Sequence, residues 1–170
     1  MDVKSPEEET ARPEQLPDEL ITSSTFLLKR LGFAAKERAM EAYEEAGLHP
    51  YHYAILLVLD EGSRVTQGSI ADALGYDRGQ LVGLLDELEE QGLVERRRDP
   101  SDRRRHIVRM TAQGARTLRR LRTLAGRTEE EFLEPLSEKQ RADLLHLLQL
   151  LAEKHEPRCA FGAPPGKTLA

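Results

Sequence analysis

Aromatic residues are scarce in this sequence. Its 170 residues include no tryptophan, four phenylalanines and four tyrosines. Hydrophobic residues make up 39% and charged residues 32% of the chain, with leucine, alanine, glutamate and arginine prominent. This balance favours a mainly α-helical fold. The length fits one domain with helical extensions, and it is sufficient to bury a core.

Cysteine is equally rare. The single cysteine, Cys159, excludes an internal disulfide and any paired-cysteine metal site. Five histidines show no tight ligand spacing, and the three-residue step from His49 to His52 is a weak signal alone. The sequence also offers no nucleophile paired with a base and no glycine-rich loop for a phosphate. We therefore expect no metal, no cofactor and no enzymatic activity.

Long apolar runs are absent as well. No run approaches the roughly 20 residues of a membrane-spanning helix, and the acidic N-terminus lacks the apolar core of a signal peptide. A cytoplasmic, reducing location without a membrane partner is therefore expected.

Negative charge is concentrated at the N-terminus. The net charge is −5, and residues 1–20 alone carry seven acids against two bases, so the remainder is neutral overall. Prolines interrupt the acids, and residues 1–18 are therefore predicted to be a disordered acidic arm. Residues 155–170 have a similar turn-rich composition and are predicted to be a flexible tail.

Helical periodicity fills the region between the two tails. Apolar residues recur at three- and four-residue steps from 20 to 46, which predicts one amphipathic helix ended by Gly47. Near the other end, Thr111 is placed to cap a helix, and Ser137 with Gln140 forms the capping box of the last helix.

The centre of the chain predicts a helix-turn-helix. A helix begins at Pro50 and is followed by two short helices, capped by Thr66 and Asp77 and separated by Gly75. Residues 94–113 then carry seven arginines against three acids, and an Asp-Pro-Ser-Asp turn divides them between two short strands. Together these elements predict a winged helix-turn-helix over residues 48–110.

Such a domain would bind double-stranded DNA. The N-terminal end of the second short helix enters the major groove, where Arg78 fits guanine or phosphate, Gln80 fits adenine and Gly79 permits close approach. Arg103 and Arg104 are placed to enter the minor groove. Ordinary solvated surface is the alternative for Arg78 and Gln80, and some of residues 96–98 are expected to face the protein or to pair with Glu95 and Asp99. The expected DNA-contacting residues are Thr66, Gln67, Arg78, Gly79, Gln80, Arg103, Arg104 and Arg105.

The basic segment resembles the wing of the MarR (multiple antibiotic resistance regulator) transcription factors. Their pattern is Gly-Leu-Val-x-Arg, then Asp-x-x-Asp-x-Arg, then a strand ending in Leu-Thr-x-x-Gly. The matching residues here are Gly92, Leu93, Val94, Arg96, Asp99, Asp102, Arg104, Thr111 and Gly114, with Met110 in place of the usual leucine. The resemblance spans roughly residues 20–153.

The predicted recognition helix departs from these relatives. Gly83 and Glu87 replace basic or hydroxyl residues, and Leu81 and Val82 replace common threonines. Base readout is therefore expected to be sparse and to depend on residues 78–80 together with the wing.

The resemblance implies a homodimer in which residues 19–47 and 111–154 form a helical dimerisation region. A two-fold dimer predicts a pseudo-palindromic operator with half-sites about 34 Å apart. The resemblance also implies a repressor whose DNA affinity is modulated by a small anionic or aromatic effector, phenolic for example. Ordinary core or surface roles are the alternative for the residues expected to line its cleft, which are Arg30, Phe33, Arg38, His52 and Tyr53.

Two alternative functions stay open at this point. One is a winged-helix module that binds a protein without specific DNA binding. The other is a redox-responsive regulator that uses Cys159, although this residue lies in the predicted tail whereas the sensing thiols of relatives lie near the first helix. The sequence indicates neither the effector nor the operator.

Overall fold

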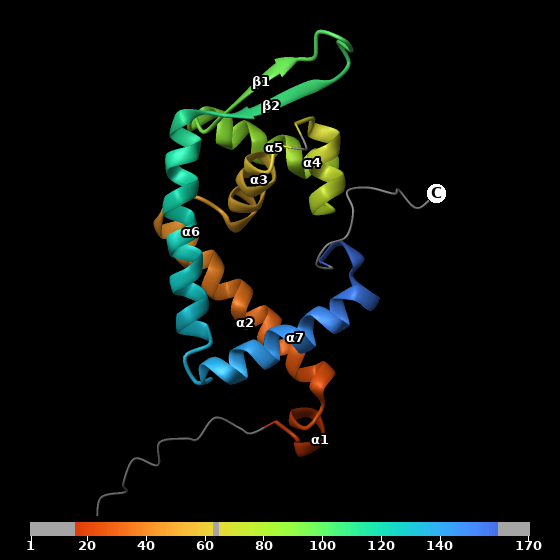
Figure 1. Cartoon of the computed structure of the whole chain (residues 1–170), viewed down its shortest axis with the longest axis vertical. Helices are drawn as coiled ribbons and strands as arrows, with labels where there is room; N and C mark the ends of the chain where they lie inside the picture. The colour runs from red at the N-terminus through yellow and green to blue at the C-terminus, as the bar shows by residue number, and fades with distance from the viewer. Residues whose placement is uncertain (1–15, 63–64, 160–170) are drawn as a thin grey trace, which may run out of the picture. The chain divides into compact units, whose positions relative to one another are not determined.

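The computed structural model describes residues 16–62 and 65–159 (Figure 1). The predicted disordered arm therefore lies almost entirely outside the described residues, as does most of the predicted tail. The chain divides after Glu37 into two compact units, which are described separately. No helix in the described part of the chain is long and apolar enough to span a membrane.

The first unit contains α1, Asp18–Ile21, and the beginning of α2, Ser24–Glu45. The prediction of one continuous helix from residue 20 is wrong, because the helix breaks at Thr22 and Ser23. The Thr22 hydroxyl donates to the Asp18 carbonyl oxygen at 2.9 Å, and Ser23 Oγ accepts from the Phe26 amide at 3.3 Å. Hydroxyl side chains that bond to nearby backbone groups in this way compete with helix continuation.

The second unit contains the predicted helix-turn-helix. Its helices are α3, Pro50–Asp60, α4, Gln67–Leu74, and α5, Arg78–Glu90. Each predicted start is confirmed, since Pro50 opens α3, Thr66 accepts from the Ser69 amide and Asp77 accepts from the amides of the first turn of α5. Gly75 closes α4 with a φ of +67°, a conformation that residues with a Cβ rarely adopt.

The wing is a two-stranded antiparallel hairpin of β1, Val94–Arg98, and β2, His106–Met110. Val94 pairs with Met110 at its base, and Arg98 pairs with His106 at its tip. Strand β2 also holds the segment before α4, because the Val108 amide donates to the Val65 carbonyl oxygen at 2.7 Å and Thr66 bridges to Ile107. The wing and the start of α4 are thereby fixed to each other.

The core of the second unit lies between α3, α4, α5, the hairpin and the helix that follows the hairpin, to which Leu118 belongs. Its largest fully buried side chains are Ile55, Leu56, Ile70, Leu81, Leu85, Leu88, Val108 and Leu118. Helix α5, the predicted recognition helix, is therefore anchored along one side by leucines, and its opposite side remains exposed.

Helix α6, Ala112–Phe132, begins against the base of the wing. The Thr111 hydroxyl donates to the Gly92 carbonyl oxygen at 2.7 Å and accepts from the Gly114 amide at 3.0 Å. A Cβ at Gly114 would overlap the Leu93 carbonyl oxygen. The Thr-x-x-Gly part of the wing motif is therefore a close junction between β2 and α6.

Helix α7, Glu138–His155, is capped by Ser137 and Gln140 as predicted. It buries no residue, and five of its leucines are large exposed apolar side chains: Leu145, Leu147, Leu148, Leu150 and Leu151. A short 3₁₀ turn, η1, follows at Pro157–Cys159, within the range predicted to be a flexible tail.

Candidate nucleic-acid interface

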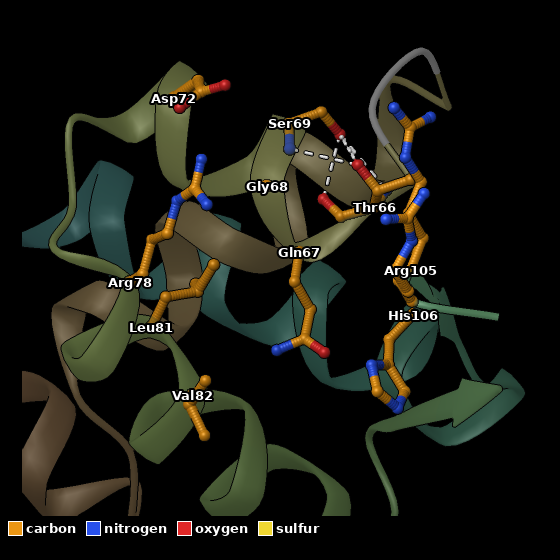
Figure 2. A pocket seen from close by; sticks show the side chains of 11 residues that line it. Thr66, Gln67, Gly68, Ser69, Asp72, Arg78, Leu81, Val82, Arg105 and His106 are labelled. Atoms are coloured by element: carbon orange, nitrogen blue, oxygen red, sulfur yellow. Dashed lines mark hydrogen bonds between the residues drawn. The ribbon is translucent and has the colours of Figure 1, made fainter. Parts of the chain in front are cut away.

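A hollow of about 670 Å³ opens on the second unit between the recognition helix and the wing (Figure 2). Three segments form it: α4 with the residue before it, the first turns of α5, and the end of the wing turn with the first residue of β2. The lining residues are Thr66, Gln67, Gly68, Ser69, Asp72, Arg78, Leu81, Val82, Arg104, Arg105 and His106. Five of the eight predicted DNA-contacting residues therefore line a single surface.

The start of α4 is a rigid edge of this hollow. Thr66 Oγ1 accepts from the Ser69 amide at 3.1 Å, and Ser69 Oγ accepts from the Thr66 amide at 3.1 Å. The Thr66 hydroxyl is thus held within the capping box, whereas Gln67 extends its amide into the hollow (Figure 2). Of this predicted pair, Gln67 is the side chain that is placed to meet a ligand.

The first turn of α5 presents side chains rather than free amides. Asp77 Oδ1 accepts from the Gly79 amide at 2.8 Å and from the Gln80 amide at 3.2 Å. These two amides are the donors that a phosphate would use at a helix N-terminus, and here a carboxylate already occupies them. Arg78 points into the hollow, while Gly79 and Gln80 are exposed outside its lining.

The acids of the wing turn shape its backbone. Asp99 Oδ1 accepts from the amide and the hydroxyl of Ser101 at 2.8 and 2.6 Å, and these hydrogen bonds hold the pKa of Asp99 below its usual range. Asp102 Oδ1 accepts from the Arg104 amide at 3.0 Å. The Asp-x-x-Asp spacing therefore builds the turn that carries the second arginine group.

The arginines of the wing divide into two classes. Arg96 faces the protein and pairs with Asp86 and Glu89 of α5, and Arg97 pairs with Glu95, as expected for part of the first group. In the second group, Arg104 and Arg105 lie 3.5 and 3.6 Å from Asp102 but remain largely exposed. Among the described residues, Arg103 has no ion-pair partner and is exposed. Arg98 of the first group is likewise exposed and has no ion pair in the described part of the chain, so it is available to a phosphate backbone together with the second group.

Sequence reasoning missed six residues that line the hollow. They are Gly68, Ser69, Asp72, Leu81, Val82 and His106. The Thr66-x-x-Ser69 capping spacing was a visible signal for Ser69. His106 and Val82 required the tertiary arrangement, because their side chains meet at the hollow only once α4 packs against both α5 and β2.

The predicted effector residues occupy varied environments, and none of them lines the hollow described above. Arg30 and Phe33 belong to the first unit, where both are exposed, and Arg38 is exposed at the start of the second. Tyr53 is half-buried, with its ring 5.6 Å from that of buried Tyr43. Burial raises the pKa of Tyr43 to about 12, with Tyr53 adding to the shift.

His52 is almost fully buried, with 2% of its surface exposed. Its Nδ1 accepts from the His49 amide at 3.2 Å, which places the ring proton of the neutral form on Nε2. Nε2 lies 2.9 Å from Glu87 Oε2 on the recognition helix, off the line of a good hydrogen bond. Burial lowers the pKa of His52, and the Glu87 carboxylate partly opposes this shift. His52 thus contacts the recognition helix.

Comparison with known proteins gives a consistent set of similarities. A family model described as MarR family matches residues 46–105. The chain is 33% identical over 127 residues to a protein of Thauera aromatica named for transcriptional regulation of the hcr operon, covering 74% of this chain and 76% of that protein.

Solved structures resemble the chain over most of its length. The transcriptional repressor CouR bound to a 23-mer DNA duplex is 36% identical, with a TM-score of 0.73 and coverage of 82% of this chain and 99% of that chain. The regulator PcaV of Streptomyces coelicolor is 29% identical, with a TM-score of 0.68 and coverage of 80% and 99%. CouR of Rhodococcus jostii RHA1 bound to p-coumaroyl-CoA is 27% identical, with a TM-score of 0.67 and coverage of 82% and 98%.

Proposed function

The chain belongs to the MarR family of transcriptional regulators, and from this premise we propose that it binds double-stranded DNA as a homodimer, under the control of a small anionic or aromatic effector. The main support is the hollow between the recognition helix and the wing, where Gln67, Arg78, Arg104 and Arg105 converge. Side chains of these types bind base edges and phosphates.

The wing geometry supports contact with the DNA backbone. Arg103 and Arg104 are carried by a turn that Asp99 and Asp102 hold through hydrogen bonds, so the two guanidinium groups extend from a defined support. Positive charge on this support is attracted to the negative potential of a minor groove. The net negative charge of the chain does not oppose this role, since it is concentrated within residues 1–20.

Dimerisation is supported by apolar surface. In α7, Leu147 and Leu150 are 58% and 50% exposed, and in α2, Leu31 and Phe33 are 53% and 57% exposed. Apolar patches of this kind mark an interaction surface in soluble proteins. A two-fold dimer would present two recognition helices, each to its own half-site, and so would favour a pseudo-palindromic operator.

Effector control is supported by relatives. CouR is described bound to p-coumaroyl-CoA, and PcaV is described in complex with its natural ligand. We propose that a related anionic aromatic compound binds this chain, with Arg38 and Tyr53 of the second unit among its contacts and His52 linking α3 to the recognition helix. An effector with different affinities for the DNA-competent and incompetent states would shift the population between them.

Selection of duplexes from a randomised pool tests the DNA-binding proposal. Enrichment of a two-fold symmetric sequence, bound by two protein chains in a mobility-shift titration, is the expected result. If the selection enriches no sequence, specific DNA binding is contradicted and a protein-interaction module is favoured. A panel of phenolic acids and their CoA thioesters then tests effector control. If no compound of the panel alters the mobility shift, effector control is contradicted.

A further inference from the structure

An exposed valine stands in the middle of the recognition helix. Val82 is 41% exposed and lines the hollow. Its helix neighbours toward the core, Leu81 and Leu85, are 1% and 0% exposed, so the core of this unit is complete without it. Valine is also a weaker helix former than alanine or leucine because its χ1 freedom is reduced in a helix. Neither helix formation nor core packing therefore requires an apolar side chain at this exposed position.

The backbone around Val82 is open to a ligand. Gly79 precedes it by one turn and Gly83 follows it directly, and a Cβ added at Gly83 would meet nothing within 4 Å. Glycine inside a helix destabilises it by roughly 0.5–1 kcal/mol relative to alanine. The packing of the chain on itself therefore does not require glycine at 83, whereas close approach of another molecule to the helix would.

Val82 is an apolar side chain in a polar hollow. Gln67, Asp72, Arg78 and His106 share the lining, and in Figure 2 Gln67 extends between Val82 and His106. Leu81 also contributes, but it is buried and forms part of the floor. A molecule entering the hollow would therefore meet hydrogen-bonding and charged groups together with the exposed methyls of Val82.

The major groove of DNA offers one apolar group on its base edges, which is the C5-methyl of thymine. We propose that Val82 is a specificity-determining residue that reads a thymine methyl, while Gln67 on the facing helix is placed to pair with an adenine. This inference rests on the proposed DNA binding and assigns the contact at the centre of α5, where the helix carries no hydrogen-bonding side chain between Gln80 and Asp86.

Replacement of thymine by deoxyuridine tests the contact, because it removes the methyl and retains every hydrogen-bonding group. In a duplex selected by the protein itself, each thymine is replaced in turn and affinity is measured by fluorescence anisotropy. At one thymine position in each half-site, the replacement should lower the affinity of the wild-type protein for the duplex about fourfold. This is the value expected for one buried methyl-sized group. In Val82→Ala the same replacement should have almost no effect.

Val65→Ala is the matched control, since Val65 is 38% exposed but does not line the hollow. This variant should retain the wild-type sensitivity to deoxyuridine. Val82→Thr, which keeps the side-chain shape, should retain part of it, and circular dichroism checks that each variant is folded.

Failure of the Val82 contact and failure of the proposed DNA binding give different results. Specific binding without any methyl-sensitive thymine, or equal sensitivity in wild type and Val82→Ala, would overturn the inference and leave DNA binding intact. Absence of any enriched duplex would overturn the proposed function itself and this inference with it.

Discussion

Arg96 on β1 holds Glu89 on α5 through three hydrogen bonds. The Arg96 amide donates to Glu89 Oε1 at 2.9 Å, and its Nε and Nη2 donate to Glu89 Oε2 at 2.9 and 2.6 Å. Asp86, one turn earlier on α5, pairs with the same guanidinium. These bonds keep the pKa of Glu89 below its usual range. They join the wing to the recognition helix, the two elements that are proposed to contact DNA.

Removing this junction should destabilise the protein and loosen the wing. Arg96→Ala should lower the free energy of unfolding by about 2 kcal/mol, since hydrogen bonds to charged groups contribute roughly 1.5–3 kcal/mol. Urea unfolding followed by circular dichroism measures this change. The matched control is Arg97→Ala, whose side chain is 69% exposed and pairs with Glu95. Equal stability of the two variants would contradict a structural role for Arg96.

The junction between β2 and α6 should be intolerant of a side chain. Gly114→Ala introduces a Cβ that overlaps the Leu93 carbonyl oxygen and approaches Met110 Cγ, so the backbone must shift. A loss of about 1–3 kcal/mol in the free energy of unfolding is expected from such overpacking. Gly126→Ala, later on the same helix and with open space at its Cβ, should instead be slightly stabilising. Thermal unfolding of both variants checks the pair.

Stability should fall on mild acidification because of His52. Its pKa is lowered from the ordinary value of 6.5 by burial, so the unfolded chain binds this proton more readily than the native chain. Between the lowered pKa and 6.5 the unfolded state therefore carries more protons, and the free energy of unfolding rises with pH. His52→Gln retains an acceptor for the His49 amide and removes the titration.

The measurement is a series of urea unfolding curves from pH 5 to 7.5 for wild type and His52→Gln. The wild type should lose stability as the pH drops below about 6.5, and the variant should lose less over the same range. Parallel pH profiles would show that His52 does not titrate in this way.

Charge placed on α7 should produce monomers. Leu147→Glu with Leu151→Glu introduces two carboxylates at side chains that are 58% and 46% exposed in one chain. The fold should survive, because α7 buries no residue, whereas a dimer interface would have to bury unpaired charge. Sedimentation equilibrium gives the mass, and a dimer retained by the double variant would place the interface elsewhere.

Local chemistry explains what could be predicted from the sequence. The starts of α4, α5, α6 and α7 depend on a capping side chain and the first turn that follows it, so Thr66, Asp77, Thr111 and Ser137 were sufficient to locate them. The hairpin followed from the Asp-Pro-Ser-Asp turn between two basic runs. The break before α2 was also encoded locally, in the hydroxyls of Thr22 and Ser23, but apolar periodicity obscured it.

Tertiary contacts account for the features that could not be predicted from the sequence. Asp86 and Glu89 become the partners of Arg96 only when β1 docks on α5, and no sequence spacing indicates that contact. His52 was expected beside an effector, and its burial against Glu87 depends on the packing of α3 under the recognition helix. The predicted effector residues and the DNA-contacting side chains remain predictions until binding is measured.

The central claim is that the wing arginines bind DNA phosphates, and the salt dependence of binding tests it most directly. Affinity for the selected duplex is measured across a salt series for wild type, for Arg103→Ala/Arg104→Ala, and for Arg127→Ala/Lys139→Ala, which removes equal charge from α6 and α7. Each phosphate contact adds roughly 0.9 to the slope of log affinity against log salt. The wing variant should bind much more weakly, with a slope shallower by about two, and the control should match wild type. An unchanged slope in the wing variant would contradict the account.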